Sequence, residues 1–289
     1  MTTLSENYFS TTDGLRLFYR DDPDHANADS AVLCLHGLTR NSRDFQQLAE
    51  HLRPNFRVIA PDMRGRGHSD YDRQWQNYYP GTYVLDMFTL LDTLKIKRVA
   101  IVGTSLGALM AMRMTAQQPQ RIAGIVLNDA GPEIDPRGLA RIAQYAGTTP
   151  TIRNWEDVAQ YVKSIYGEAL WGLSDADWLA YAKLTYRENS EGIPVPDYDT
   201  NIGNAFRANS PANTSAPTLW PVFAQIIKTP MLVIRGEHSD ILSAATVLRM
   251  AKEKPDLNYV AVPDRGHAPL LNEPVCVTAI DRFLNELKF

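Results

Sequence analysis

AIVGTSLGALMAMR, residues 100–113, places one serine between two glycines at the point where an apolar run changes character. The residues before Ser105 are mainly Val and Ile, which is typical of a buried strand, and those after it are small or helix-forming. Gly103 and Gly107 have the G-x-S-x-G spacing of a sharp strand-to-helix turn. Such a turn exposes the serine hydroxyl from a strained backbone and needs small flanking residues, because side chains there would collide. The stretch predicts a nucleophilic serine; a serine that only caps a helix is the alternative.

Short apolar runs like the one before this serine recur along the chain and do not alternate with polar residues. They cover 31–36, 56–60, 99–103, 122–128, 231–235 and 257–262, and segments of helical character at 42–52, 83–94, 105–117, 243–252 and 275–287 lie between or after them. Strands buried on both faces have this composition, and alternation with helices indicates right-handed crossovers. We therefore expect an α/β fold with a mostly parallel central sheet and helices on both faces. Ahead of it, residues 8–20 predict a hairpin that turns at Asp13-Gly14.

Residues 132–223 interrupt this alternation. They contain no convincing buried strand, hold four of the five tryptophans, and include two helical segments with the N-cap residues Asn154 and Ser174. Residues 193–217 are expected to form a long irregular loop. We expect 132–223 to be a mainly helical cap inserted into a core domain of residues 1–131 and 224–289. Most of its aromatic side chains should form a small core, with the others lining a pocket.

The composition is that of a globular protein. The 289 residues are 44% hydrophobic and 21% charged, the net charge is −4, and no basic cluster suggests a nucleic-acid partner. Cys34 and Cys276 form no CxxC pair, so neither a disulfide framework nor a zinc site is expected, and a reducing compartment fits. No signal-peptide core or membrane-spanning run is evident. We expect a soluble cytoplasmic protein that acts on a small molecule; the sequence does not indicate its oligomeric state.

A nucleophilic serine needs a general base, and His267 is the best placed of the six histidines. It follows the apolar run 257–262 and precedes the last helical segment, so it lies on a loop at the carboxyl edge of the sheet. Ser105 lies at that same edge, where open α/β sheets form their sites. His25, in a polar loop, and His51, in a helical segment, are expected at the surface.

The acid that orients the base has more than one candidate. Asp240 lies in GEHSDILS, directly after the strand 231–235, and so falls at the same edge of the sheet. Asp129 follows the strand 122–128 and is an alternative acid, and Glu237 is a third. An N-cap or a solvated loop charge is the plainer interpretation of Asp240, and sequence alone does not determine the geometry.

Backbone N–H groups at two positions are candidates for an oxyanion hole. His36-Gly37-Leu38 follows the strand 31–36, where such a donor is expected, and Leu106 follows the serine. Leu38 and Leu106 would donate their N–H groups, whereas His36 is expected to be structural. The plainer interpretation of the His-Gly pair is a tight turn that packs on the serine turn, and the two interpretations are compatible.

The glycine-rich loop PDMRGRGHSD, residues 61–70, does not have the pattern of a phosphate-binding loop. It lacks the third glycine of GxGxxG and the Lys-Ser/Thr of a P-loop. Asp62 and Arg64 are expected to hold this loop together.

The motifs HGLT, DMRGRGHSD, GTSLG, RGEHSD and GHAP stand in an order that resembles the α/β-hydrolase family. The resemblance covers nearly the whole chain and is weakest in 132–223, where the family has its variable cap. It is most similar to the capped esterases, enol-lactone hydrolases and carbon–carbon bond hydrolases. The resemblance implies Ser105 as nucleophile, His267 as base and Asp240 as acid, with neither metal nor organic cofactor. Some members place the acid where this chain has Asp129.

These features predict a hydrolase that cleaves a small to medium carboxylic ester or lactone through an acyl-enzyme on Ser105. A carbon–carbon hydrolase of dienoic ring-cleavage products is an alternative and would need polar anchors, for which Arg113, Arg187 and Arg207 are candidates by residue type. A ligand receptor on a hydrolase scaffold, with little turnover, is another. A peptidase or an acyltransferase is also open, because the fold hosts many functions.

Overall fold

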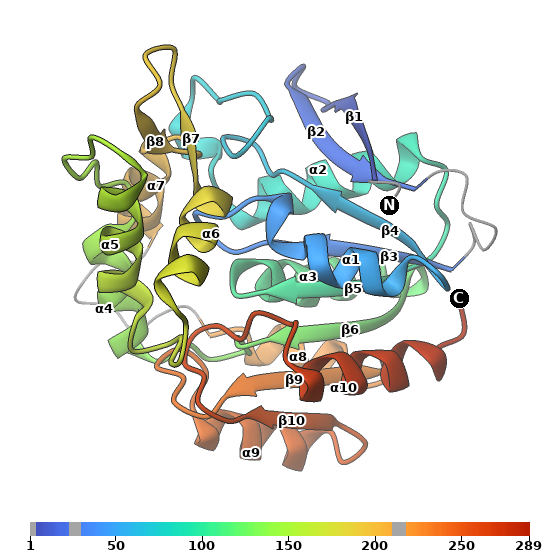
Figure 1. The fold of residues 1–289 in the computed structure, drawn as a ribbon. Coiled ribbons are helices and arrows are strands. Elements are labelled where there is room, and N and C mark those ends of the chain that lie inside the picture. The colour runs from blue at the N-terminus through green and yellow to red at the C-terminus, as the bar shows by residue number, and fades with distance from the viewer. Residues whose placement is uncertain (1–3, 23–29, 210–217) are drawn as a thin grey trace.

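The computed structural model describes residues 4–22, 30–209 and 218–289, and in them an eight-stranded sheet forms the centre of the molecule (Figure 1). Its spatial order is β1 (Ser5–Ser10), β2 (Arg16–Asp21), β4 (Arg57–Pro61), β3 (Ala31–Leu35), β5 (Val99–Thr104), β6 (Ile122–Asn128), β9 (Met231–Gly236) and β10 (Asn258–Val262). Strands β4 to β10 pair in parallel, whereas β1 and β2 form an antiparallel hairpin joined to β4. Gly14 adopts φ +89° in the turn of that hairpin. The predicted fold class and hairpin are confirmed.

Helices cover both faces of the sheet, because successive strand residues point to opposite sides. In β5, Ile101 belongs to one buried hydrophobic cluster and Val102 to the other. The first face is covered by α2 (Pro80–Thr93), α3 (Leu106–Gln117), α8 (Trp220–Gln225) and α9 (Ala244–Glu253). The second face is covered by α1 (Gln46–Leu52) and α10 (Pro274–Asn285). Short 3₁₀ turns lie elsewhere in the chain, at Ser42–Phe45, Trp75–Asn77 and Pro119–Arg121. The edge strand β10 is largely exposed, unlike the buried strand that its sequence predicts, because nothing pairs with its outer edge in the described residues.

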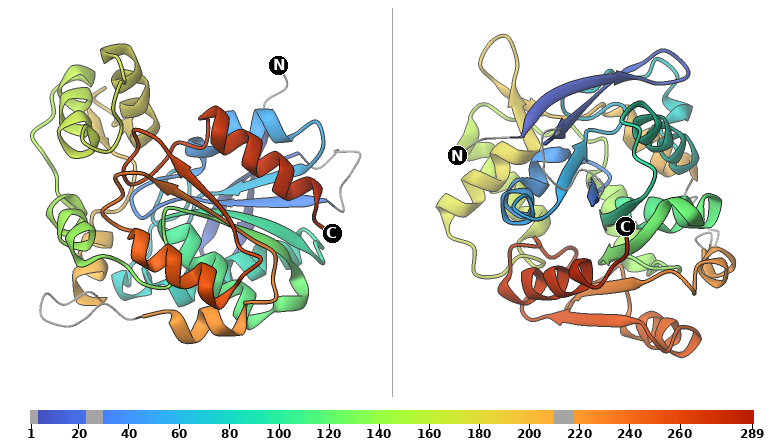
Figure 2. Two further views of the ribbon diagram at one scale, coloured as in Figure 1. Left: turned by 90° about the horizontal axis from the view of Figure 1, so that it is seen from below. Right: turned by 90° about the vertical axis from the view of Figure 1, so that its right-hand side faces the viewer.

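The segment between β6 and α8 is mainly helical and lies to one side of the sheet (Figures 1 and 2). It contains α4 (Pro136–Tyr145), α5 (Trp155–Tyr166), α6 (Asp175–Thr185), β7 (Tyr186–Glu188), β8 (Pro194–Pro196) and α7 (Asn201–Asn209). The side chains of Asn154 and Ser174 cap α5 and α6 as predicted. Val158, Val162 and Trp178 are among the residues of a separate small hydrophobic cluster in this segment.

Two features of this segment differ from the sequence prediction. Within the predicted irregular loop 193–217, β8 pairs with β7 and α7 follows it, so the described part, 193–209, is not irregular, and 210–217 lie outside the described residues. The helix begins next to Asp199, whose carboxylate accepts the backbone N–H of Asn201 and so supplies a local cap that the sequence analysis missed. Near the other end of the segment, Trp220 and Phe223 of α8 belong to the main hydrophobic cluster. The proposed division into cap and core therefore stays a prediction.

Candidate active site

The turn between β5 and α3 holds Ser105 as the G-x-S-x-G spacing predicts. Ser105 has φ 55° and ψ −113°, a conformation that few non-glycine residues adopt, and α3 begins directly after it. A Cβ atom on Gly103 would lie 2.4 Å from the backbone of Gly107, and one on Gly107 would lie 2.0 Å from the carbonyl oxygen of Leu35. Both glycines are therefore required by the close approach of backbone to backbone.

Ser105, His267 and Asp129 form a continuous hydrogen-bonded chain. The Ser105 hydroxyl lies 2.8 Å from Nε2 of His267, and Nδ1 of His267 lies 2.8 Å from a carboxylate oxygen of Asp129. Because the carboxylate is an acceptor, Nδ1 carries the proton and Nε2 is left to accept from the serine. His267 is 7% exposed and Asp129 is fully buried. The structure thus brings together Ser105 and His267, as predicted.

The carboxylate of Asp129 is fixed by groups at and just after the end of the neighbouring strand β9. Asp129 follows β6 with φ 58°; one of its oxygens accepts the N–H of Gly236 at 2.9 Å and the other accepts the hydroxyl of Ser239 at 2.7 Å. The three donors to this buried carboxylate set its orientation before any substrate binds.

Asp240, the acid favoured by the sequence and by the family resemblance, does not contact His267. Its two carboxylate oxygens accept bonds from Nε and Nη2 of Arg141 in α4, at 2.6 and 2.8 Å. Burial alone would raise the pKa of Asp240, but the hydrogen bonds and charge of Arg141 outweigh it and lower that pKa. The third candidate, Glu237, is an exposed side chain beside His238. The prediction of Asp240 as the partner of His267 is wrong in this geometry, and the alternative Asp129 occupies that place.

The His-Gly turn after β3 packs against the serine turn. A Cβ on Gly37 would lie 3.7 Å from Cβ of Ser105, so the Gly37–Leu38 peptide borders the hydroxyl. Nε2 of His36 accepts the N–H of Met63 at 3.1 Å, so its Nδ1–H donates to the Gly37 carbonyl at 2.8 Å. Burial, followed by the positive charge of Arg66, lowers the pKa of His36 to about 3, so the ring is neutral. His36 thus holds the peptide unit that carries the Leu38 N–H.

A second contact fixes the same turn from the other side of Leu38. Nε of the buried Arg66 donates to the Leu38 carbonyl at 2.9 Å. On the serine side, Leu106 is the first residue of α3, and the N–H groups of a first helical turn have no acceptor within the helix. The two N–H groups named by the sequence analysis therefore lie on two elements that meet at Ser105.

The loop of residues 61–70 is held together by Asp62 and Arg64, as expected. One oxygen of Asp62 accepts the N–H of Ser42 at 2.7 Å and the other accepts that of His68 at 2.9 Å. The buried guanidinium of Arg64 pairs with the carboxylates of Asp13, Asp72 and Asp86. These contacts tie the loop to the 3₁₀ turn Ser42–Phe45, to the turn between β1 and β2, and to α2.

A cleft of about 470 Å³ opens over Ser105 and His267. One side of the cleft comes from the His-Gly turn, the 3₁₀ turn Ser42–Phe45 and α1, and the other side comes from α4, α5 and α6. The lining side chains on that other side are mostly apolar or aromatic: Ile142, Tyr145, Tyr166, Leu170, Leu173, Ala180, Tyr181 and Leu184. A cleft of this size suits a small or medium organic substrate.

The arginines named by residue type as substrate anchors do not line this cleft. Arg187 pairs with Asp197 at 3.3 Å, and Arg207 donates to a backbone carbonyl. Two other arginines, Arg40 and Arg43, do line it, but their guanidinium groups are bonded to the carboxylates of Asp44 and Asp197. No sequence motif marks them.

Of the remaining histidines and cysteines discussed in the sequence analysis, those that the structure describes lie outside the candidate active site. His51 lies near the surface and hydrogen-bonds Asp281, as expected, whereas His25 lies outside the described residues. Cys34 and Cys276 are both buried free thiols, and burial raises the pKa of Cys34 to about 12.

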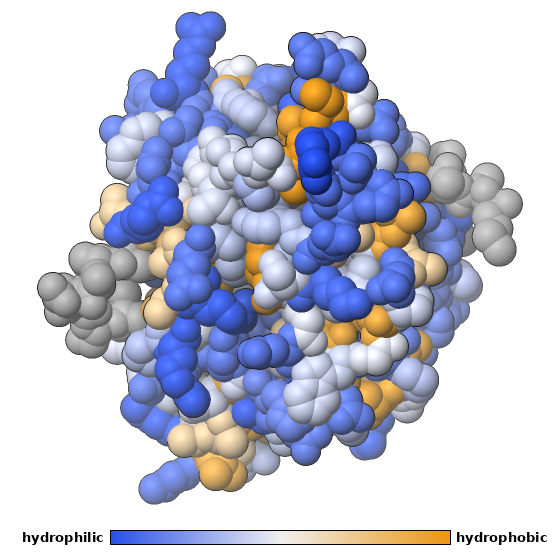
Figure 3. Space-filling model, turned by 60° about the vertical axis from the view of Figure 1, so that its left-hand side comes forward, coloured by the Kyte–Doolittle hydropathy of each residue, from blue (hydrophilic) through white to orange (hydrophobic). Residues whose placement is uncertain are grey.

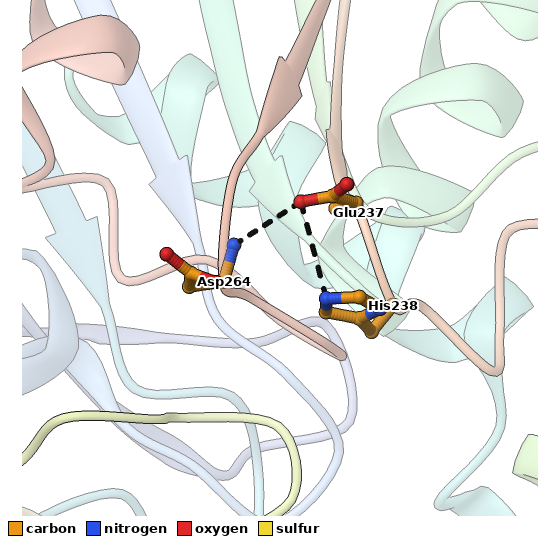
Figure 4. A group of neighbouring side chains, drawn as sticks. All are labelled: Glu237, His238 and Asp264. Carbon is orange, nitrogen blue, oxygen red and sulfur yellow. Dashed lines mark hydrogen bonds and ion pairs between the residues drawn. The ribbon is translucent and has the colours of Figure 1, made fainter.

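One group of side chains in the described ranges has the spacing of metal ligands. Glu237, His238 and Asp264 each offer one donor atom, and these atoms lie within 4.8 Å of one another (Figure 4). All three side chains are exposed, and none lines the cleft over Ser105. The group is therefore separate from the candidate active site.

Comparison with known proteins agrees with the fold. The family model described as the alpha/beta hydrolase fold matches residues 30–274 of this chain. The chain belongs to the α/β-hydrolase family, and it is a hydrolase of that type.

Individual relatives match over nearly their whole length. The 3-hydroxybutyrate-oligomer hydrolase of Cupriavidus necator is 33% identical over 274 residues, which cover 93% of this chain and 92% of the relative. The 2-(acetamidomethylene)succinate hydrolase of Mesorhizobium japonicum is 28% identical over 88% of this chain and 87% of its own. Among solved structures, an α/β hydrolase from Novosphingobium aromaticivorans superposes with a TM-score of 0.92 and 41% identity, over 99% of both chains.

None of the helices in the described ranges has the length and apolar character needed to cross a bilayer. The face that carries α4 to α7 is mainly hydrophilic, with hydrophobic residues in small separate patches (Figure 3).

Proposed function

We propose that the protein is a serine hydrolase that cleaves a small to medium carboxylic ester through an acyl-enzyme on Ser105. The observation that carries the proposal is the hydrogen-bonded chain from the Ser105 hydroxyl through His267 to Asp129. Its arrangement is that of a nucleophile, a general base and an orienting acid.

In the proposed reaction, Ser105 Oγ attacks the ester carbonyl while Nε2 of His267 takes the hydroxyl proton. The imidazolium then gives this proton to the leaving alcohol, and the acyl group stays on Ser105. His267 next deprotonates a water molecule that attacks the acyl-enzyme and releases the acid. Asp129 holds the Nδ1–H tautomer and stabilises the imidazolium throughout.

The oxyanion that forms in both steps needs donors that are in place beforehand. We assign these donors to the backbone N–H groups of Leu38 and Leu106, beside the N-terminus of α3. The neutral His36 supports the assignment, because its bond to the Gly37 carbonyl fixes the peptide unit that donates. Removal of one such donor typically slows an enzyme by a factor on the order of 10² to 10³.

Ester cleavage is supported by the C. necator relative, whose name states that it hydrolyses 3-hydroxybutyrate oligomers. Such oligomers are chains of hydroxy acids joined by ester bonds. We further propose that residues 132–223 form a cap over the cleft. We also propose that the protein is located in the cytoplasm. Neither the triad chemistry nor the reaction requires a metal or an organic cofactor.

The test is hydrolysis of p-nitrophenyl esters from acetate to dodecanoate, with Ser105→Ala as the matched control. We expect turnover that depends on Ser105 and is fastest for short acyl chains, because the cleft is about 470 Å³. Full activity of Ser105→Ala would contradict the proposal. If a fluorophosphonate labels Ser105 but no ester is turned over, the substrate would instead be a lactone or a substrate of carbon–carbon bond hydrolases. No turnover and no labelling would favour the receptor alternative.

A further inference from the structure

A row of three tyrosines forms one wall of the cleft and has no part in the reaction described above. Tyr145 ends α4, Tyr166 ends α5, and Tyr181 lies in α6; all three line the cleft together with Ser105. Neighbouring ring centroids lie 5.7 Å and 5.5 Å apart, with both pairs in edge-to-face contact. Because each ring is braced by the next, the row presents a preformed surface to a bound substrate.

The hydroxyl groups of this row retain hydrogen-bonding capacity. Tyr145 and Tyr166 interact with each other, and the structure gives the Tyr181 hydroxyl no partner among the described residues. The Tyr181 hydroxyl is not one of the fully buried polar atoms that lack a partner. Because Tyr181 lines the cleft, its hydroxyl is accessible from the cleft. Tyr161 on α5 is a contrast, since its hydroxyl lies 2.9 Å from that of Thr148 and it does not line the cleft.

The hydroxyls of Tyr145 and Tyr181 are neutral donors under ordinary conditions. Burial, followed by the neighbouring Tyr166, raises the pKa of Tyr145, and burial raises that of Tyr181. If this wall faced only hydrocarbon, the Tyr181 O–H, which has no protein partner, would be left unsatisfied at a cost of about 1–3 kcal/mol. Phe or Leu at these positions would line the cleft without that cost. Tyrosines are therefore suited to a substrate whose oxygen atoms accept hydrogen bonds from the hydroxyls.

The charges beside the row favour an uncharged acceptor. The guanidinium carbon of Arg40 lies 4.3 Å from the Tyr181 ring centroid, but Arg40 is paired with Asp44. Arg141, whose charge acts on Tyr145, is paired with Asp240. Both cations are thus paired with their own carboxylates, and Arg141, whose Nη1 has no partner, does not line the cleft.

We propose that Tyr145, Tyr166 and Tyr181 form a binding subsite for a second, uncharged oxygen of the substrate, a hydroxyl or carbonyl remote from the scissile ester. This subsite would make the protein selective for hydroxyacyl or oxoacyl esters over plain alkyl esters of equal length. The inference rests on the proposed esterase function and names the substrate class of the same cleft.

The experiment compares p-nitrophenyl 3-hydroxybutanoate with p-nitrophenyl butanoate, which differ only in one hydroxyl group. The measured quantity is the ratio of kcat/KM for the two esters in the wild type, in Tyr181→Phe, Tyr145→Phe and Tyr166→Phe, and in the control Tyr161→Phe. We expect a wild-type ratio well above one that falls about tenfold in Tyr181→Phe, as the loss of one hydrogen bond predicts. The ratio should also fall in the other two cleft variants and stay unchanged in Tyr161→Phe.

An unchanged ratio in all three cleft variants would overturn the subsite, as would an equal fall in Tyr161→Phe. A tyrosine-dependent preference for the p-nitrophenyl monoester of succinate would overturn the choice of an uncharged oxygen. Binding of ethyl 3-hydroxybutanoate and ethyl butanoate to Ser105→Ala, followed by calorimetry, separates this inference from the proposed function. If turnover is absent but Ser105→Ala prefers the hydroxy ester and loses this preference with Tyr181→Phe, the subsite stands and the esterase function falls.

Discussion

Asp129 and His267 are joined by a hydrogen bond of 2.8 Å between a carboxylate oxygen and Nδ1, although 138 residues separate them in the chain. The other candidate, Asp240, is held by Arg141 instead. Which of the two acids supports catalysis can therefore be decided by matched substitutions.

Asp129→Asn should lower kcat by a factor on the order of 10⁴, because an amide cannot hold the Nδ1–H tautomer or stabilise the imidazolium. Asp240→Asn should keep kcat within a few-fold, since the Asp240 carboxylate hydrogen-bonds Arg141 and makes no hydrogen bond to His267. Steady-state kinetics on a p-nitrophenyl ester, with circular dichroism to verify folding, checks both. If Asp240→Asn is the crippled variant, the assignment of the acid is wrong.

Gly107→Ala should prevent stable folding of the serine turn. The added Cβ would lie 2.0 Å from the Leu35 carbonyl oxygen, and neither backbone can move without breaking the sheet. We expect a loss of about 3 kcal/mol in the free energy of unfolding, the upper end of the usual range for overpacking. Gly37→Ala is the matched control, because its nearest contact would be an ordinary 3.5 Å. Urea denaturation that finds the two variants equally stable would refute this explanation of the glycine.

His36 should affect the rate through the Gly37–Leu38 peptide. His36→Asn retains a donor near the position of Nδ1, which can still bond the Gly37 carbonyl. His36→Gln places its acceptor near Nε2, so it can serve Met63 but not Gly37. We expect kcat to fall about tenfold in His36→Gln, with KM within about twofold, and to be largely kept in His36→Asn. A purely structural role would lower the stability of both variants and leave the kcat of the folded protein alike in the two.

The same histidine should make folding sensitive to acid. The pKa of His36 is about 3 in the folded state against an ordinary value of 6.5, so below pH 6.5 the unfolded chain binds a proton that the folded protein does not. Stability is therefore lost as the pH falls through this window, by about 2 kcal/mol between pH 7 and pH 5 for this group. Urea denaturation at the two pH values should show a smaller loss in His36→Asn than in the wild type. Equal losses would mean that His36 is not the buried neutral group described here.

Most of the sheet and the serine turn could be predicted because their signals are local. Apolar runs, the G-x-S-x-G spacing and the His267 loop each depend on residues close together in sequence. The acid could not be chosen that way, because Asp129 and Asp240 follow the neighbouring parallel strands β6 and β9 at the same edge. The choice depends on Arg141, 99 residues before Asp240, which binds that carboxylate.

The tyrosine row and the β7–β8 hairpin could not be predicted from the sequence for a related reason. Tyr145, Tyr166 and Tyr181 lie on three different helices and meet only through tertiary packing. Strands β7 and β8 have three residues each and include Pro194 and Pro196, so neither shows the period of a strand. Such features follow from the fold and not from any local pattern.

The central claim is that Ser105 becomes acylated during turnover. Rapid acid quenching of the protein with excess p-nitrophenyl butanoate, followed by peptide mass spectrometry, tests it directly. We predict a butanoyl group on the peptide that contains Ser105, and accumulation of this adduct in Asp129→Asn if deacylation becomes the slow step. Turnover of the ester with no acyl group on Ser105, or with equal rate in Ser105→Ala, would contradict the account.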